Sequence, residues 1–225
     1  MNQLVDTFIE KGVVPVQYTM KVSFVFLLLV VLATGLSAQI KSTIFGTDHD
    51  IASLGGGCKG CHAPHQASAK GEVLLWVQGF PTTTTFWIYY SPTMNTAPTE
   101  VGGNYSATNL PVGAKVYTVL CLSCHDGLTT PSVITATDGA AIANPTNSDG
   151  LRNDHPVNLV YNPSSDPGLE PLATAQTAGA VFFTEGTNQT VQCASCHNVH
   201  DNTKTPFLRV ANTNAKAGLC TTCHK

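Results

Sequence analysis

The sequence predicts a mostly irregular chain with short helices and few short strands, built from two repeated modules. Three observations support this fold class. The 225 residues include 19 glycines and 13 prolines, and 8% are aromatic, which disfavours a large helical bundle. All 8 cysteines fall in Cys-x-x-Cys-His units. These units and the histidines around them follow the same order twice along the chain, as in an internal repeat.

The N-terminal region contains a predicted secretory signal peptide at residues 20–38. Lys21 supplies a basic start, an apolar run covers 22–33, and the small residues of 36–38 form a cleavage site. The run is shorter than the roughly 18 apolar residues that a spanning helix needs. An uncleaved membrane anchor is therefore the less favoured alternative, and we expect no stable membrane span. We interpret residues 1–19 as a misassigned N-terminal extension.

Four Cys-x-x-Cys-His units carry the chemistry of the chain. Two thiols separated by two residues, with a histidine directly after the second, form the attachment signature of c-type haem. The thiols join the haem covalently, and the histidine reaches the iron as its proximal ligand. The units are Cys58, Cys61 and His62; Cys121, Cys124 and His125; Cys193, Cys196 and His197; and Cys220, Cys223 and His224.

Paired cysteines have two other common uses in proteins. Such pairs also bind zinc, and cysteines of exported proteins form disulfides. A zinc site does not require a histidine after each second cysteine, and a disulfide framework does not require the same spacing four times. The sequence therefore predicts four covalently bound haem c groups.

Four histidines lie outside these units. Four is also the number of second axial ligands that four haem irons require. These histidines are His49, His65, His155 and His200. Met94 is the single methionine after residue 38, so methionine can serve at most one iron. Since methionine ligation raises the reduction potential, the sequence predicts low-potential, bis-histidine haems.

The ligands repeat within one tetrahaem domain, 39–225, whose dihaem halves span about 39–127 and 150–225. Each half contains a free histidine, a Cys-x-x-Cys-His-x-x-His segment and a further Cys-x-x-Cys-His unit. A histidine three positions after a proximal ligand lies on the same face of a helical turn, so it reaches a neighbouring haem. We therefore expect His65 to bind the haem of His125, and His200 the haem of His224.

We expect short helices at the attachment units and strands at 73–77, 86–90 and 181–183. The segments 126–154 and 161–190 are rich in loop-forming residues. Apolar periodicity is too weak for an ordinary core, so the haems are expected to supply it. Five aromatic residues are expected to pack either on haem edges or in ordinary contacts: Trp76, Phe86, Trp87, Tyr89 and Tyr90.

Composition and ligand count narrow the function. Charged residues make up 11% of the chain, against about a quarter in ordinary proteins, and the net charge is -3. A nucleic-acid binder needs a basic patch, and a disordered acidic tail needs a run of like charges. The low content of charged residues disfavours both classes of protein. The ligand count leaves no open iron, and no nucleophile–base pair or phosphate loop stands out. We therefore expect one-electron transfer through closely spaced haems, not an enzyme.

Flanking segments complete the pattern: His49-Asp50, Pro64-His65, Leu120 to Gly127, Asp154 to Val157, Phe207-Leu208-Arg209 and the terminal Cys220 to His224. The chain resembles the extracellular multihaem c-type cytochromes that polymerise into conductive filaments, in particular the tetrahaem, OmcE-like cytochrome nanowires. The resemblance implies a filament of identical subunits that carries electrons from redox partners at the cell surface to outside acceptors. It also implies that one distal histidine comes from the neighbouring subunit.

Ligands near both ends of the predicted mature chain suit head-to-tail growth into an open filament. We expect His49 to bind the haem of His197 in the next subunit, and His155 to bind the haem of His62. Two alternatives remain. A soluble periplasmic or secreted tetrahaem shuttle would hold all eight ligands in one chain, and a multihaem reductase would contain a five-coordinate haem.

Overall fold

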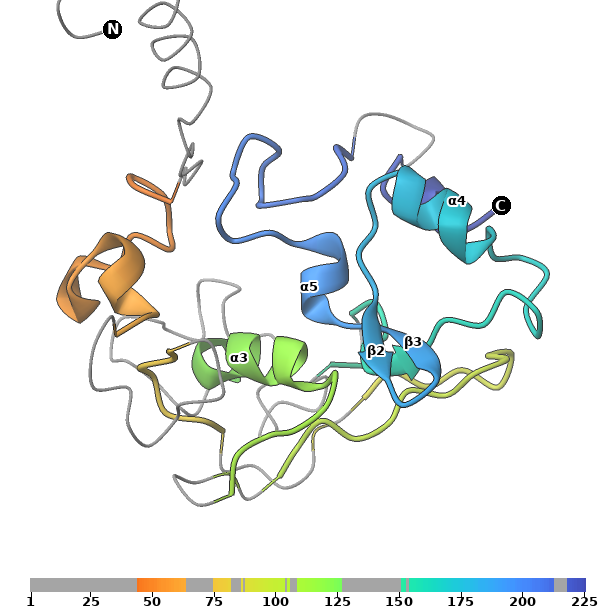
Figure 1. Ribbon diagram of the computed structural model, residues 1–225, viewed down its shortest axis with the longest axis horizontal. Helices are drawn as coiled ribbons and strands as arrows, with labels where there is room; N and C mark the ends of the chain where they lie inside the picture. Colours follow the sequence, from red (N-terminus) through yellow and green to blue (C-terminus); the bar gives the residue numbers. More distant parts are fainter. Residues whose placement is uncertain are drawn as a thin grey trace, which may run out of the picture. The chain divides into compact units, whose positions relative to one another are not determined.

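The computed structural model describes residues 44–63, 75–81, 86, 88–103, 105, 109–126, 151–152, 154–212 and 218–225. All of them belong to one compact unit, Ser42–Lys225. None of the helices in this part of the chain is long and apolar enough to span a membrane. In chain order the elements are η1 (Ala52–Leu54), η2 (Gly57–Gly60), α3 (Val116–His125), β1 (Leu159–Val160), α4 (Leu172–Thr177), β2 (Phe183–Glu185), β3 (Asn188–Val191), α5 (Cys193–Cys196) and η4 (Cys220–Thr222) (Figure 1).

Each Cys-x-x-Cys-His unit lies in or next to a short helix. In three units the backbone N–H of the histidine donates to the carbonyl of the first cysteine. The N···O distances are 2.8 Å for His62, 3.1 Å for His197 and 2.9 Å for His224. One such turn brings residues three and four apart to the same face. The two thiols and the imidazole therefore project from one short stretch of backbone.

A three-stranded antiparallel sheet precedes α5, in the order β1-β3-β2. Leu159 pairs with Val191, and Phe183 pairs with Thr190. Gly186, at φ 59°, lies in the turn between β2 and β3, where its left-handed backbone is easily adopted. Because β3 ends two residues before Cys193, the sheet fixes the start of the third attachment turn.

The structure corrects part of the predicted secondary structure. The segment 161–190, expected as loop apart from a strand at 181–183, contains α4, β2 and most of β3. The strand β2 begins at Phe183, so it shares only that residue with the expected strand. Pro171 stands at the N-cap of α4, a place where its missing N–H costs little. In the described parts of 73–77 and 86–90, Trp76 and Ile88 form isolated bridges to His62 and Leu151 instead of strands. The segment 127–150 lies outside the described residues.

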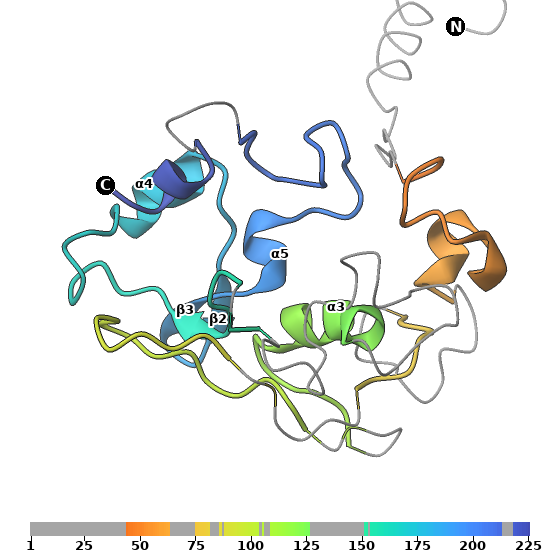
Figure 2. The same ribbon diagram turned by 180° about the vertical axis from the view of Figure 1, so that it is seen from behind.

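Protein side chains form three small hydrophobic clusters in the described part of the chain. Helix α3 contributes to two of them, and residues in and around β3 and α4 form the third. Figure 2 shows the course of these three elements. The fully or nearly buried members are Phe80, Tyr105, Val119 and Leu120; Phe86, Val101, Leu122 and Leu151; and Tyr161, Ala175, Phe182 and Val191. Tyr90, expected in packing contacts, is exposed, whereas Trp87 lies outside the described residues.

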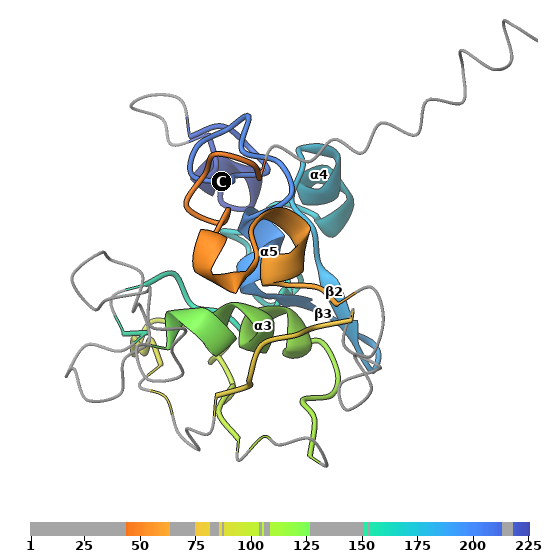
Figure 3. The same ribbon diagram turned by 90° about the vertical axis from the view of Figure 1, so that its left-hand side faces the viewer.

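A buried hydrogen-bond network joins α3 to α5, which lie side by side (Figure 3). Gln192, at the N-cap of α5, accepts a 2.7 Å bond from the Thr118 hydroxyl and donates a 3.0 Å bond to Thr190. The same Thr118 oxygen accepts the backbone N–H of Cys193 at 3.2 Å. Thr118 and Gln192 are both completely buried. The second and third attachment turns are thus held together by polar contacts that water does not reach.

Replacing Gln192 by alanine is expected to lower the free energy of unfolding by about 2–4 kcal/mol, since it leaves buried partners without hydrogen bonds and opens a cavity. Guanidinium denaturation of the haem-loaded protein, followed by circular dichroism, measures this change. The matched control is Gln176→Ala on the exposed face of α4, which should change stability by less than about 0.5 kcal/mol. Equal effects of the two variants would contradict the role given to the network.

Candidate functional site

All eight cysteines of the four units are described, and each is a free thiol. The disulfide alternative therefore has no support in the structure. Among the described residues, no three His, Cys, Asp or Glu side chains converge as they would around an ion bound by protein ligands alone. A tetrahedral zinc site needs four such ligands, so the zinc alternative also lacks support.

Consecutive attachment turns lie close to one another. Burial raises the pKa of the Cys124 thiol to about 11; a Ser123 hydrogen bond lowers it, and the nearby Cys61 thiol raises it further. Burial likewise raises the pKa of Cys196 to about 11, with a further contribution from Cys223. The first unit therefore neighbours the second, and the third neighbours the fourth.

The second and third units meet through their first cysteines. The Cys121 thiol forms a hydrogen bond with Cys193, which raises the pKa of Cys121 and lowers that of Cys193. This contact lies beside the Thr118–Gln192 hydrogen bond between α3 and α5. The four units thus form a continuous series in space, in the same order as in the sequence.

Six of the eight histidines form three facing pairs, each made of one proximal and one distal histidine. The ring centroids are 6.0 Å apart for His49 and His125, 6.2 Å for His62 and His200, and 6.3 Å for His155 and His224. The angles between the ring planes are 49°, 20° and 62° in the same order.

These distances fit imidazole pairs that bind one metal ion from opposite sides. Imidazole–metal bonds are about 2.0–2.1 Å long, so two such rings place their centroids roughly 6.2–6.4 Å apart. Two histidines also carry the second contact typical of metal ligands. Nδ1 of His155 lies 2.9 Å from the Pro156 carbonyl oxygen, and Nδ1 of His197 lies 3.1 Å from that of Pro206. With the proton on Nδ1, Nε2 is left as the metal-binding atom.

Burial favours the neutral form of three distal histidines, which is the form that binds metal. It lowers the pKa of His49, His155 and His200, and the facing histidine of each pair lowers it further. Nδ1 of His49 is buried without a hydrogen-bond partner. Its ring meets the Phe207 ring edge-on at 4.6 Å. This imidazole is therefore held in place by packing.

The facing pairs differ from the pairs expected from the sequence. His49 faces His125 of its own chain, whereas a site in the next subunit was expected. His200 faces His62 instead of His224, and His155 faces His224 instead of His62. His65 lies outside the described residues. The three-residue spacing indicates that a histidine such as His200 does not bind the haem of the unit that it follows. It does not determine which of the other haems that histidine binds.

Trp76 was expected to make packing contacts, whereas the contacts that support the C-terminal unit had no signal in the sequence. The Trp76 ring meets His62 edge-on at 6.0 Å, and its indole N–H donates to the Ser123 hydroxyl at 3.2 Å. At the C-terminus, the backbone N–H of Lys225 donates to Gly168 at 2.9 Å, and that of Glu170 donates to Cys223 at 2.8 Å. These backbone contacts hold the fourth unit, although it stands at the end of the chain.

Comparison with known proteins agrees with this geometry. Residues 186–225, which contain the third and fourth units, match the family model of the doubled CXXCH motif. The paired motif indicates a multihaem c-type cytochrome. No curated protein matches the chain. The free thiols and facing imidazoles of the described chain fit covalent haem c. When bound, this group supplies a one-electron redox centre.

Each cysteine pair of this chain is expected to hold one haem. We expect the wild-type protein, after acid extraction of unbound haem, to carry four haem masses by intact mass spectrometry. The Cys58→Ser/Cys61→Ser variant should carry three, because a hydroxyl does not form the thioether.

The matched control, Cys220→Ser/Cys223→Ser, should also carry three, and the combination of both double variants should carry two. An unchanged mass in either double variant would show that its cysteine pair does not attach haem.

Proposed function

We propose that this protein transfers electrons one at a time through four covalently attached, bis-histidine haems. The observation that carries the proposal is the set of three facing imidazole pairs, each joined through its proximal histidine to a pair of free thiols. The continuous series of attachment turns supports transfer along the chain, because consecutive redox groups would be neighbours. No enzymatic reaction is needed to account for these groups.

We further propose that the protein is the polymerising subunit of an extracellular filament, exported by the signal peptide at 20–38. The low charge supports this role over that of a soluble shuttle, since shuttles carry charged docking patches. The signal peptide and residues 1–19 lie outside the described residues. The acceptors are outside the cell, and the donors are redox partners at its surface.

The number of histidine ligands indicates at which haem a neighbouring subunit would contribute one. With three pairs formed within the chain, His65 and His197 complete the set of eight. We therefore propose that subunits are linked at the haem of His197, by His65 of the neighbouring subunit. His49 is then not the linking ligand. In a soluble shuttle the same ligand, His65, would come from the same chain.

Carbon monoxide binding to the reduced protein distinguishes these functions. Filaments seen by negative-stain microscopy of the secreted fraction should bind no carbon monoxide, because every iron would have two imidazoles. After mild dissociation into monomers, about a quarter of the haem should bind it, because one distal ligand would leave with the neighbour.

A shuttle would appear as single particles that bind no carbon monoxide in any state. A reductase would bind it without dissociation. The matched variant is His65→Ala, which should prevent filament formation if this histidine joins two subunits. Filaments of normal length from His65→Ala would overturn its role as the linking ligand.

A further inference from the structure

One of the three facing pairs joins the two halves of the sequence repeat. His62 belongs to the first attachment unit, whereas His200 follows the third unit by three residues. Their rings are 6.2 Å apart and, at 20°, closer to parallel than in the other two pairs. The separation agrees with the 6.0 Å and 6.3 Å of the pairs that stay within one half.

The position of His62 is set by contacts that do not involve His200. Its backbone N–H closes the first attachment turn on Cys58, and the residue forms an isolated antiparallel bridge with Trp76. On either side of this bridge, Ala63 donates to Leu75 at 2.9 Å, and Val77 donates to Cys61 at 3.0 Å. The backbone at His62 is therefore held by its own half of the chain, and the Trp76 ring meets the imidazole edge-on at 6.0 Å.

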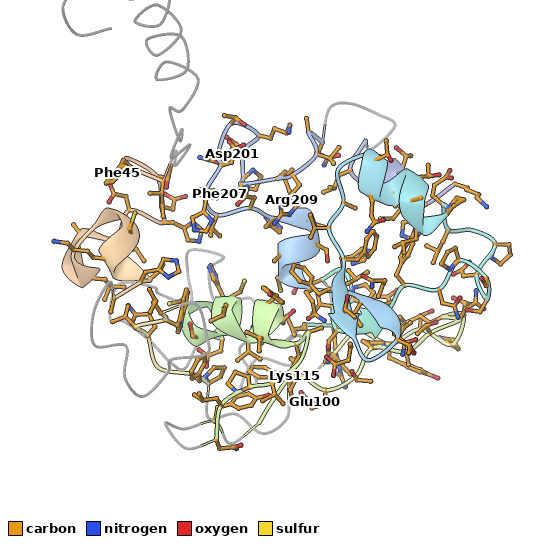
Figure 4. All side chains as sticks on the ribbon, viewed as in Figure 1. Phe45, Glu100, Lys115, Asp201, Phe207 and Arg209 are labelled. Atoms are coloured by element: carbon orange, nitrogen blue, oxygen red, sulfur yellow. The ribbon has the colours of Figure 1, made fainter. Side chains whose placement is uncertain are left out.

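The position of His200 is set by the loop after α5. Its backbone N–H donates to the Asn198 side chain at 3.2 Å, and the Asn198 N–H donates to the Phe207 carbonyl at 2.7 Å. Figure 4 shows Asp201, Phe207 and Arg209 on this segment. The Arg209 guanidinium returns to α5, where Nε donates to the Ala194 carbonyl at 2.7 Å. Two independently anchored imidazoles thus face one another.

We propose that His200 is the distal axial ligand of the haem attached at Cys58 and Cys61, so that the second half of the repeat completes a site of the first. This inference rests on the proposed function, because it requires covalent haem at the first unit. The two imidazoles donate lone pairs from opposite sides, and neither changes its covalent structure. The repeated sequence then folds as one interlocked unit and not as two dihaem modules.

The experiment identifies which haem loses a histidine when His200 is changed. In His200→Met, about a quarter of the haem absorbance should titrate at a higher potential in spectroelectrochemistry, because methionine ligation raises it. This component should disappear when Cys58→Ser/Cys61→Ser is added. It should remain when Cys220→Ser/Cys223→Ser is added instead.

The matched control is His155→Met, because His155 faces His224. Its high-potential component should remain when Cys58→Ser/Cys61→Ser is added and disappear when Cys220→Ser/Cys223→Ser is added. The proposal is overturned if the His200→Met component disappears when Cys220→Ser/Cys223→Ser is added and remains when Cys58→Ser/Cys61→Ser is added. That result would support the pairing of His200 with the haem of His224 expected from the spacing. A wild-type protein without covalent haem by mass would instead overturn the proposed function itself.

A second variant covers the case in which methionine is not tolerated. In His200→Gly, one haem should become high-spin, and added imidazole should restore the low-spin spectrum by occupying the place of the lost ring. The high-spin signal should be absent from the same variant lacking Cys58 and Cys61. Its persistence there would also overturn the proposal.

Discussion

A separation of about 6 Å between facing imidazole rings is the constraint on which the rest of the described structure depends. It occurs three times, between residues that are distant in the sequence. Each pair requires two backbone segments to approach closely while keeping their side chains directed at one another. The short helices at the attachment units and three isolated bridges meet this requirement, since each fixes the backbone at or next to a proximal histidine. The bridges join His62 to Trp76, His197 to Leu208 and His224 to Leu169. Regular secondary structure is sparse because it serves mainly as a set of local anchors.

The contact between α3 and α5 shows how these anchors combine. Thr118 and Gln192 exchange a buried hydrogen bond, and one turn further along α3 the Cys121 thiol meets Cys193. A buried polar bond is directional, so it fixes both the spacing and the rotation of the two turns. The apolar clusters around α3 bury its side chains, whereas this polar contact determines which groups of the two turns approach each other.

The sequence singles out eight cysteines and eight histidines as candidates for haem attachment and ligation, because covalent geometry fixes the spacing of the Cys-x-x-Cys-His unit. These assignments stay predictions. The sequence also predicted short helices at these units. It did not predict the pairs, because the partner of His62 or His155 depends on long-range folding and not on local spacing. The strand of Asn188–Val191 was missed because its residues are mostly polar and show no alternation. It forms because both neighbours pair with it. Pro171 marked a loop in the sequence but begins a helix in the structure.

The pairing of His62 with His200 has a consequence for how the protein is made. Most of the described chain separates the two residues, so the first unit is synthesised long before its partner is available. Closing so long a loop is slow, because its entropy is lost before the contact forms. A chain truncated anywhere before residue 200 would carry its first haem with a single protein ligand. Open iron of that kind binds oxygen, so an incomplete polypeptide would differ from a finished one in its reactivity as well as in its length.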